Sequence, residues 1–339
     1  MSHEKDVLVS VVIVNYNGAE FLEPCLQSVY SQAYRPIEVI VVDNASSDES
    51  VRIMREKFPD ARLILCERNI GFAGGNNRGV MEATGDYVVL LNNDTIVEPQ
   101  WLTALLEYAT KPEVGVATSR VITEGVPDKF YEMNGTISYL GYNIMREFAD
   151  VSQVFFGSAA SLIFKKANVD RPFLDEFFLY HEDVFLSWKL RLMGLDVRMA
   201  QHSVVRHKGS ATTRRQPSRM VTFYQERNRL LNVLFFFERR TLVLLIPYLI
   251  LDAVAKTILS LLTQRKSLLG ILRAYWWIGA NLRWVLHQRE MLQSKRRVPD
   301  SEIMKLMSCK VVDGDNLLSR WINGLSKLYA TSVGLAHHG

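Results

Sequence analysis

Apolar blocks that end abruptly in polar residues mark the first third of the chain. Runs rich in β-branched residues occur at 7–14, 37–42, 63–66 and 87–91, and between them apolar residues recur at helical spacing, as in 21–30. Because these runs lack polar alternation, they suit strands of a sheet that is covered on both faces. The alternation of strands and helices along the chain implies parallel pairing of the strands with right-handed crossovers. We therefore predict an α/β fold with a doubly wound, mostly parallel sheet and helices on both faces.

Two connections in this part carry more specific expectations. Ser46 or Ser47 is expected to cap the helix after the second strand, with Asp48 and Glu49 in its first turn, where they face the positive end of the helix dipole. The run 69–79, rich in Gly and Asn, is expected to be a loop that leads into a short helix.

The alternation weakens after residue 123. Residues 123–153 are rich in Gly, Tyr and Asn, which suits irregular strands and a mobile loop over a site. A strand is expected at 159–164, then a helix that opens near Glu182 and ends at Gly194, and finally a strand and polar loop at 202–210. These elements complete a first domain, residues 1–219.

Residues 220–339 have a different composition and are expected to form a helical region. The segment 223–240 is apolar on one side, and 241–251 carries no charge before Asp252 and Lys256 interrupt it. That run is about half of the ~20 residues that cross a bilayer, which favours an interfacial or buried helix over a spanning one. Basic and aromatic residues are interspersed over 265–297, a composition that suits binding to the surface of an anionic lipid leaflet. A bundle or dimer interface with a solvated basic face is the alternative.

Composition excludes some classes of protein. The 339 residues are 48% hydrophobic, ample for a core, and the net charge of +4 is too small to indicate nucleic-acid binding. Cys25, Cys66 and Cys309 are far apart and lack metal-ligand spacing, which fits a reducing compartment. The first apolar run is too short for a signal peptide, so we expect a cytoplasmic protein.

Acidic residues follow two of the predicted strands and open a later helix. Asp43 and Asp94 stand at strand ends, the edge at which open α/β sheets bind ligands, and a carboxylate there can hold a divalent cation against phosphate oxygens. Each candidate also has a plainer interpretation. Asp43 and Asp183 suit helix or turn caps, 92–95 suits an Asx turn, and a lone His207 suits the surface.

Several motifs in order resemble glycosyltransferase family 2 over about residues 7–215. They are Val11–Gly18, Val41–Asp48, Asn69–Asn77, Asn92–Asp94 and the pair Glu182–Asp183. The resemblance implies the GT-A fold, in which an Asp-X-Asp motif ends the fourth strand. Asn92 takes the first acidic position here and brings no charge, so weak metal affinity is expected. The third and fourth motifs are similar to bacterial rhamnosyltransferase-like members, which use dTDP-L-rhamnose.

The resemblance also implies a role for each matching residue. Asp183 would be the general base, Asp94 and His207 would bind Mg²⁺ or Mn²⁺, and Glu182 would bind the acceptor or cap its helix. Donor-binding residues would be Asn15, Asn17, Asp43, Asn44, Asn76, Asn92 and Asn93, with Asp43 on the nucleotide base. Arg68 is a basic side chain near them that could also contact donor phosphates, although an isolated charge is more often solvated.

The mechanism implied is inversion. Asp183 would accept the proton of an acceptor hydroxyl as that oxygen attacks the anomeric carbon, and the nucleoside diphosphate would leave from the opposite face. A carboxylate with an ordinary pKa of about 4 is ionised at pH 7, so we expect its position to matter more than a change in its pKa.

The predicted protein is thus an inverting, metal-dependent glycosyltransferase of cell-surface polysaccharide synthesis. Its partners would be a nucleotide-diphosphate sugar and a lipid-linked or growing glycan, at the inner face of the plasma membrane, with a homodimer through the C-terminal helices as a further expectation. One alternative is a noncatalytic nucleotide-sugar-binding membrane scaffold. A nucleotide-dependent oxidoreductase is disfavoured, because Asn15-Tyr16-Asn17-Gly18 stands where Gly-x-Gly-x-x-Gly would be required.

Overall fold

A computed structural model describes most of the chain. The described residues are 7–123, 130–147, 154–209, 218–263, 267–311 and 317–335. They form two compact units: unit 1 contains 1–134, 147–187 and 195–215, and unit 2 contains 135–146, 188–194 and 216–339. The mobile loop expected over a site falls in part on 124–129 and 148–153, which lie outside the described residues.

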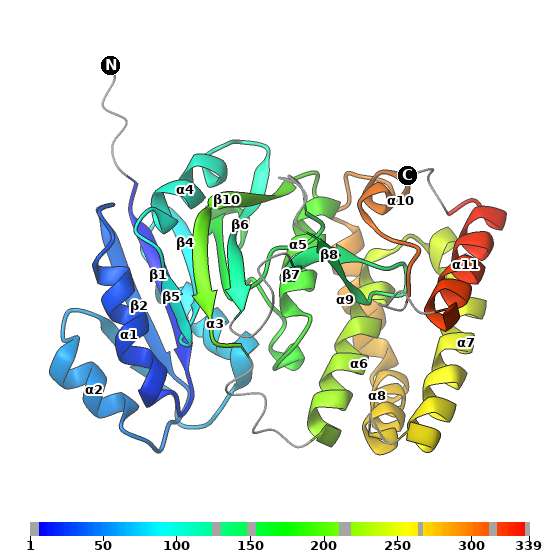
Figure 1. Ribbon diagram of the computed structural model, residues 1–339, viewed down its shortest axis with the longest axis horizontal. Coiled ribbons are helices and arrows are strands. Elements are labelled where there is room, and N and C mark those ends of the chain that lie inside the picture. The colour runs from blue at the N-terminus through cyan, green and yellow to red at the C-terminus, as the bar shows by residue number, and fades with distance from the viewer. Residues whose placement is uncertain are drawn as a thin grey trace. The chain divides into compact units, whose positions relative to one another are not determined.

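An eight-stranded mixed sheet lies at the centre of unit 1 (Figure 1). The strand order is β3-β2-β1-β4-β9-β6-β10-β5. The strands are β1 (Val9–Asn15), β2 (Ile37–Asp43), β3 (Arg62–Leu65), β4 (Tyr87–Asn92), β5 (Thr95–Val97), β6 (Val114–Thr123), β9 (Ser161–Lys165) and β10 (Asp196–His207). β3, β2, β1 and β4 pair in parallel, as do β6 and β10, whereas β9 and β5 pair antiparallel with their neighbours. The predicted α/β fold class is confirmed, with antiparallel strands in the second half of the sheet.

Helices connect the strands. They are α1 (Ala19–Tyr30), α2 (Ser50–Lys57), α3 (Gly71–Glu82), α4 (Trp101–Ala109) and α5 (Glu182–Leu192), with 3₁₀ turns η1 (Lys166–Asn168) and η2 (Asp175–Phe177). β7 (Phe130–Ile137) and β8 (Asn143–Glu147) form a separate two-stranded sheet.

The two faces of β1 explain why its sequence is apolar throughout. Val11 and Ile13 belong to the core that also contains apolar side chains of α1, α2 and α4. Val12 and Val14 point the other way, because they contact the glycines of α3. Alternate residues of a strand face opposite sides of a sheet, so helices on both sides require an unbroken apolar run.

The glycine-rich run is a helix, and the expectation of a loop at 69–79 was wrong. α3 begins at Gly71, and a Cβ atom would lie 2.7 Å from Val14 Cγ1 at Gly75 and 2.3 Å from Val12 Cγ1 at Gly79. These glycines therefore permit close approach of the helix to β1 and do not mark a turn.

The cap expected before α2 is also different in the structure. Asp48 Oδ1 accepts a hydrogen bond from the backbone N–H of Ser50 at 3.0 Å, and Asp48 Oδ2 accepts one from Ala19 N at 2.9 Å. Ser46 and Ser47 instead bond to the loop after β1. The N-cap residue of α2 is Glu49, which makes no side-chain capping bond, and Asp48, one residue earlier, bonds the first N–H group of the helix.

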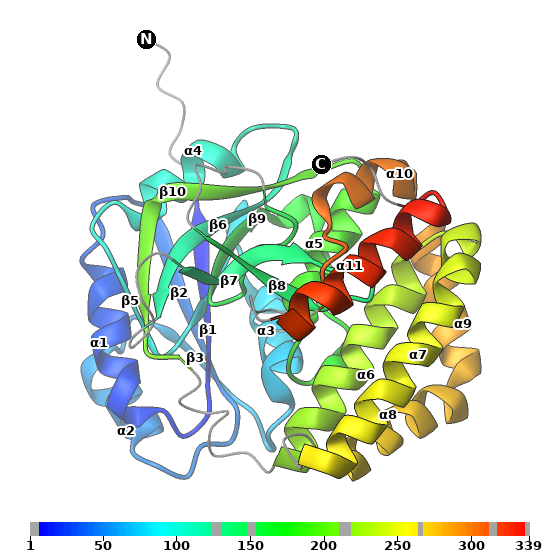
Figure 2. The ribbon, with the colours of Figure 1, turned by 45° about the vertical axis from the view of Figure 1, so that its right-hand side comes forward.

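Unit 2 is mainly helical (Figure 2). Its elements include α6 (Ser218–Phe236), α7 (Arg239–Thr263), α8 (Leu268–Ala280), α9 (Leu282–Gln293), α10 (Asp300–Ile303), the 3₁₀ turn η4 (Met304–Leu306) and α11 (Leu317–Ser332). Residues 239–261 of α7 are long and apolar enough to cross a membrane, by length and composition alone, and an 18-residue stretch within them has a mean hydropathy of 2.1. Asp252 and Lys256 end the uncharged run but do not interrupt the helix, and the preference for an interfacial or buried helix over a spanning one stays a prediction.

Candidate active site

Asn15, at the end of β1, joins the ends of three neighbouring strands. Its side chain is fully buried, and its Nδ2 donates to Asp43 Oδ1 and to Ser46 Oγ, each at 3.2 Å. Its Oδ1 accepts from Asn93 Nδ2 at 2.7 Å. Asp43 Oδ2 accepts from Ser46 N at 2.9 Å. The ends of β1, β2 and β4 thus meet at one edge, as the parallel order of the strands predicts.

The loops after β1 and β2 are held in uncommon conformations. Asn17 has φ 51° and Ala45 has φ 64°, in the left-handed region that non-glycine residues seldom adopt. Asn17 N donates to Ser46 Oγ at 2.9 Å, and Asn17 Oδ1 accepts from Ser47 N at 2.8 Å. Such conformations persist where the surroundings fix them, and here each loop fixes the other.

Asn44 and Asn76 contact the start of α3. Asn44 Nδ2 donates to Gly71 O at 2.8 Å, and Asn44 Oδ1 accepts from Ile70 N at 3.3 Å. Asn76 Nδ2 donates to Phe72 O at 2.9 Å. Both side chains are almost fully buried and bonded to the protein, so their contact with a donor stays a prediction.

Asp94 and His207 lie together beyond β4. The antiparallel pairing of β5 with β10 sets His207 opposite Thr95, and Lys208 N donates to Asp94 O at 3.0 Å. His207 Nε2 is 3.0 Å from Asp94 Oδ1 and 3.3 Å from Asn92 Nδ2. Asn92 Oδ1 and His207 Nδ1 are buried without a hydrogen-bond partner among the described residues.

These side chains suit a divalent cation only in part. Among the residues that the structure describes, no group of three or more His, Cys, Asp and Glu side chains is arranged to hold a metal ion. Asp94 Oδ1 and His207 Nε2 supply one carboxylate oxygen and one imidazole nitrogen, 3.0 Å apart, as potential ligands of one cation. With two phosphate oxygens they would make an acceptable set for Mn²⁺ or Mg²⁺, so the residues fit a cation that arrives with a nucleoside diphosphate.

The first turn of α5 brings Asp183 to the end of β4. The Asp183 carboxylate accepts hydrogen bonds from the backbone N–H groups of Val184, at 2.8 Å, and Ala159. The next residue, Ala160, accepts one through its carbonyl from Asn92 N at 3.0 Å. Bonds through backbone and side chains therefore connect the surroundings of Asp43, Asp94 and Asp183 around one strand end.

Both acidic residues at the start of α5 have altered titration. Burial raises the pKa of Asp183, although the N–H groups of Val184 and Ala159 oppose this rise. Burial, and then the charge of Asp183, raises the pKa of Glu182, whose Oε2 is buried without a hydrogen-bond partner among the described residues. The expectation of an ordinary pKa for Asp183 was wrong, because its surroundings exclude water more than its sequence neighbours suggest.

The sequence indicates that 173–181 leads into α5, but sequence reasoning missed how the fold holds this segment. Asn77 of α3 binds its start: Nδ2 donates to Phe173 O at 2.9 Å and to Asp175 Oδ1 at 2.7 Å, and Oδ1 accepts from Phe173 N at 3.1 Å. Phe178 O accepts from Ala73 N at 3.2 Å. Phe178, Tyr180 and His181 have φ values of 59°, 70° and 62°. Only the Asn in the glycine-rich run signalled this contact.

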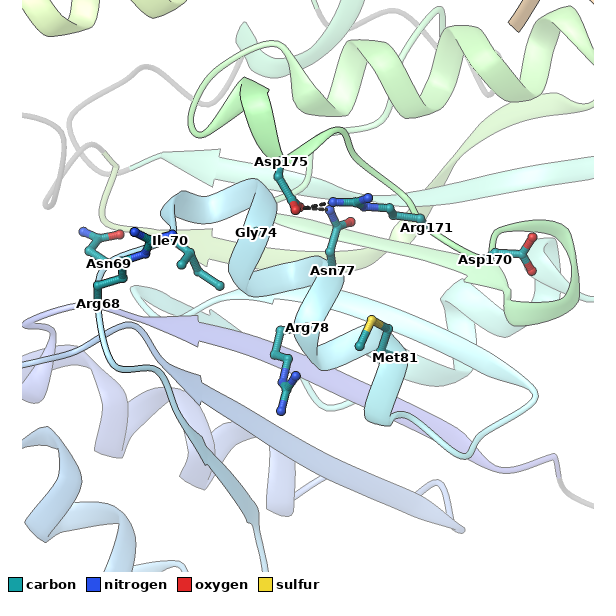
Figure 3. A pocket seen from close by; sticks show the side chains of 10 residues that line it. All are labelled: Arg68, Asn69, Ile70, Gly74, Asn77, Arg78, Met81, Asp170, Arg171 and Asp175. Atoms are coloured by element: carbon teal, nitrogen blue, oxygen red, sulfur yellow. Dashed lines mark hydrogen bonds and ion pairs between the residues drawn. The ribbon is translucent and has the colours of Figure 1, made fainter. Parts of the chain in front are cut away.

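A hollow of about 610 Å³ lies on the outer side of α3 (Figure 3). Its lining includes Arg68, Asn77 and Arg78, and Asp175 points toward Arg171 and Asn77 there. Asp43, Asp94 and Asp183 are not part of it. Arg68 thus lies in a hollow that the other predicted site residues do not line, and its contact with a donor stays a prediction.

Known proteins resemble this chain in sequence and fold. It is 27% identical to the amylovoran biosynthesis glycosyltransferase AmsB of Erwinia amylovora over 61% of this chain and 75% of AmsB. The crystal structure of S. aureus TarS 1-349 in complex with UDP has a TM-score of 0.54, with 15% identity over 96% of this chain and 89% of that one. That of GalNAc-T7 with UDP, GalNAc and Mn²⁺ has a TM-score of 0.56, with 14% identity over 70% and 49%.

The family match covers the ends of β1, β2 and β4 but not Asp183 or His207. The chain spans only 38% and 32% of the length of two other glycosyltransferases that it matches at 34% and 33% identity. At these identities the solved structures support the GT-A fold alone. Residues 10–171 match the sequence model described as Glycosyl transferase family 2, so the chain contains a glycosyltransferase family 2 domain.

Proposed function

We propose that this protein is an inverting glycosyltransferase that moves a sugar from a nucleotide-diphosphate donor to a hydroxyl of a lipid-linked or growing glycan. The observation that carries the proposal is the hydrogen-bond network at one edge of the sheet, which links the surroundings of Asp43, at the end of β2, with those of Asp94 and Asp183, beside the end of β4. An open α/β sheet binds nucleotides at such an edge. The relationship to AmsB supports a role in polysaccharide synthesis.

In this proposal the residues divide the work. Asp183 accepts the proton of the acceptor hydroxyl, and its raised pKa makes it a better proton acceptor than an ordinary carboxylate while it is still ionised. Asp43 hydrogen-bonds the nucleotide base. Asp94 and His207 hold a divalent cation, which offsets charge on the departing diphosphate when it is bound. The Mn²⁺ in the GalNAc-T7 structure supports the use of a cation.

The donor and location are the finer parts of the proposal. We take dTDP-L-rhamnose as the donor, on the resemblance of Asn69–Asn77 and Asn92–Asp94 to rhamnosyltransferase-like proteins. We place the protein at the inner face of the plasma membrane, attached peripherally. The apolar exterior of α7 supports that location.

Thermal shift with a panel of nucleotide sugars, with and without Mn²⁺, tests the donor, because a ligand bound only by the folded state raises its stability. The panel contains dTDP-L-rhamnose, UDP-GlcNAc and GDP-mannose. Release of nucleoside diphosphate then tests turnover. Asp183→Asn is expected to keep the donor-induced rise in melting temperature and lose transfer. Near-wild-type turnover of Asp183→Asn would refute the assignment of the base, and a donor-induced rise in melting temperature without any release of nucleoside diphosphate by the wild type would favour the noncatalytic alternative.

A further inference from the structure

Beyond its first turn, helix α7 carries its charged residues on the inside and many apolar residues on the outside. Val243, Ile250 and Val254 are at least half exposed. The two charged residues within this stretch, Asp252 and Lys256, lie one turn apart, with only 14% and 12% of their side chains exposed. A surface helix of a protein in water shows the reverse arrangement, with its apolar stripe against the core.

A cluster of charges holds the inner side of α7 within unit 2. Arg229 Nη2 of α6 is 2.6 Å from Glu226 Oε1 and 3.1 Å from Asp252 Oδ2. Lys256 Nζ is 2.7 Å from Glu226 Oε2 and 3.1 Å from Asp252 Oδ2. Tyr142 OH donates to Asp252 Oδ1 at 2.7 Å. Because every charge has a partner, the cluster can be buried, and it fixes which side of α7 faces outward.

Helix α11 repeats the inverted pattern. Leu317, Trp321, Leu325 and Leu328 recur at helical spacing and are exposed, with 85% of Leu317 and 65% of Trp321 accessible. The inner side of α11 holds small and polar residues, Ser319, Ser326 and Ala330.

The two helices contact each other. Tyr329 OH donates to Leu244 O, and the Tyr248 and Tyr329 rings are 5.3 Å apart. Both helices lie toward the viewer in Figure 2. We define the α7/α11 face by eleven exposed apolar residues of the two helices; they are Val243, Ile246, Ile250, Leu251, Val254, Ile258, Leu261, Leu317, Trp321, Leu325 and Leu328.

Charge favours an anionic surface as the occupant of this face. Residues 216–339 contain 18 Lys and Arg against eight Asp and Glu. Arg239 and Arg240 are exposed where α7 begins, and Arg320 and Lys327 are exposed on α11. Basic residues beside exposed apolar stripes are the pattern of helices that lie in the interface of an anionic membrane.

We propose that the α7/α11 face enters one anionic leaflet, with α7 in its plane and not across it. The inference rests on the membrane association in the proposed function. It adds which surface of the protein binds the membrane and how deeply α7 enters it. A spanning α7 would take Asp252 and Lys256, together with Glu226 and Arg229 of α6, into the hydrocarbon core. An in-plane helix keeps that cluster in the protein.

Vesicle flotation of the full chain tests the surface. Vesicles of phosphatidylethanolamine and phosphatidylglycerol at a 3:1 ratio are compared with pure phosphatidylcholine. The variants are Ile250→Glu with Val254→Glu, and Trp321→Glu with Leu325→Glu. Met81→Glu is the matched control, because Met81 is 64% exposed but lies in unit 1. We expect binding to the anionic vesicles, a loss of about tenfold or more in both double variants, and no loss in the control.

Each other outcome overturns the inference in a distinct way. Binding that survives in both double variants would place attachment elsewhere on the chain. If the wild type ignores vesicles, and sedimentation shows a dimer that the double variants break, the face is an interface between two copies. Arg239→Cys and Leu259→Cys lie outside the α7/α11 face and are made in a chain whose three native cysteines are replaced. Protection of only one of them from an impermeant maleimide outside sealed vesicles would show that α7 spans the bilayer. Donor-induced changes in melting temperature, measured without vesicles, separate failure of the proposed transferase from failure of this surface.

Discussion

Replacing Asn77 should lower the stability of the protein and disturb the segment that leads into α5 and Asp183. Asn77 is 5% exposed and makes three hydrogen bonds to the segment that leads into α5. Each bond contributes ~1 kcal/mol net, and Asn77→Ala leaves the N–H and C=O of Phe173 unpaired in a buried place, so the free energy of unfolding should fall by about 2–4 kcal/mol. The melting temperature should fall by about 4–10 °C.

A charge swap isolates the contact with Asp175. Asn77→Asp removes both N–H donors and sets a second carboxylate where the present bond is 2.7 Å long, so it should be less stable than Asn77→Ala. Adding Asp175→Asn restores a donor and should recover part of the loss. Arg78→Ala, on the next and exposed position of α3, is the matched control and should change stability by less than ~0.5 kcal/mol.

The assays are urea unfolding and sugar transfer at a temperature at which every variant is folded. Because 173–181 sets the approach to α5, turnover should fall in Asn77→Ala while the donor-induced rise in melting temperature stays. An Asn77→Ala variant as stable as Arg78→Ala, or a double variant no better than Asn77→Asp, would refute this account of the segment.

Three further predictions concern single groups. Glu182→Gln should raise stability at pH 8 but not at pH 4. The raised pKa of Glu182 means that the folded state binds more protons than the unfolded chain, so the stability of the wild type falls as pH rises, by at most ~1.4 kcal/mol for each pH unit. Melting curves against pH check this, and an equal difference between variant and wild type at both pH values would contradict it. Gly79→Ala should destabilise by about 1–3 kcal/mol, because its Cβ would lie 2.3 Å from Val12 Cγ1, and Val12→Ala should relieve the clash; urea unfolding of both variants decides. Asp94→Asn should weaken the Mn²⁺ dependence of transfer and of donor binding, and full activity of the wild type after chelation would remove Asp94 and His207 as ligands.

The sequence predicted those parts of the fold that depend on local apolar pattern. The strands β1, β2 and β4 lie where their β-branched runs predict, and the parallel order brings Asp43 and Asn93 to one edge. The prediction from the sequence pattern was wrong where glycine can either form a turn or allow a helix to pack closely. Gly75 and Gly79 looked like turn residues, and only the distance to β1 shows that they make room for a helix.

Other features of the site arise only from contacts between distant segments. The raised pKa of Asp183 comes from its burial in the folded chain, against the opposing effect of a backbone group of Ala159, 24 residues earlier in the numbering. The left-handed residues before α5 have no composition signal, because Phe178, Tyr180 and His181 rarely adopt such angles. Neither could be read from spacing.

Under the proposed function, the shared amide of Asn15 limits how donor preference could be re-engineered in this protein. Both N–H groups of that amide already serve Asp43 and Ser46, and its oxygen serves Asn93. A substitution in any one of the three loops would therefore disturb the other two before a new sugar could be accommodated. Library designs that change the loops together, with Asn15 left in place, have better prospects than those that randomise one loop at a time.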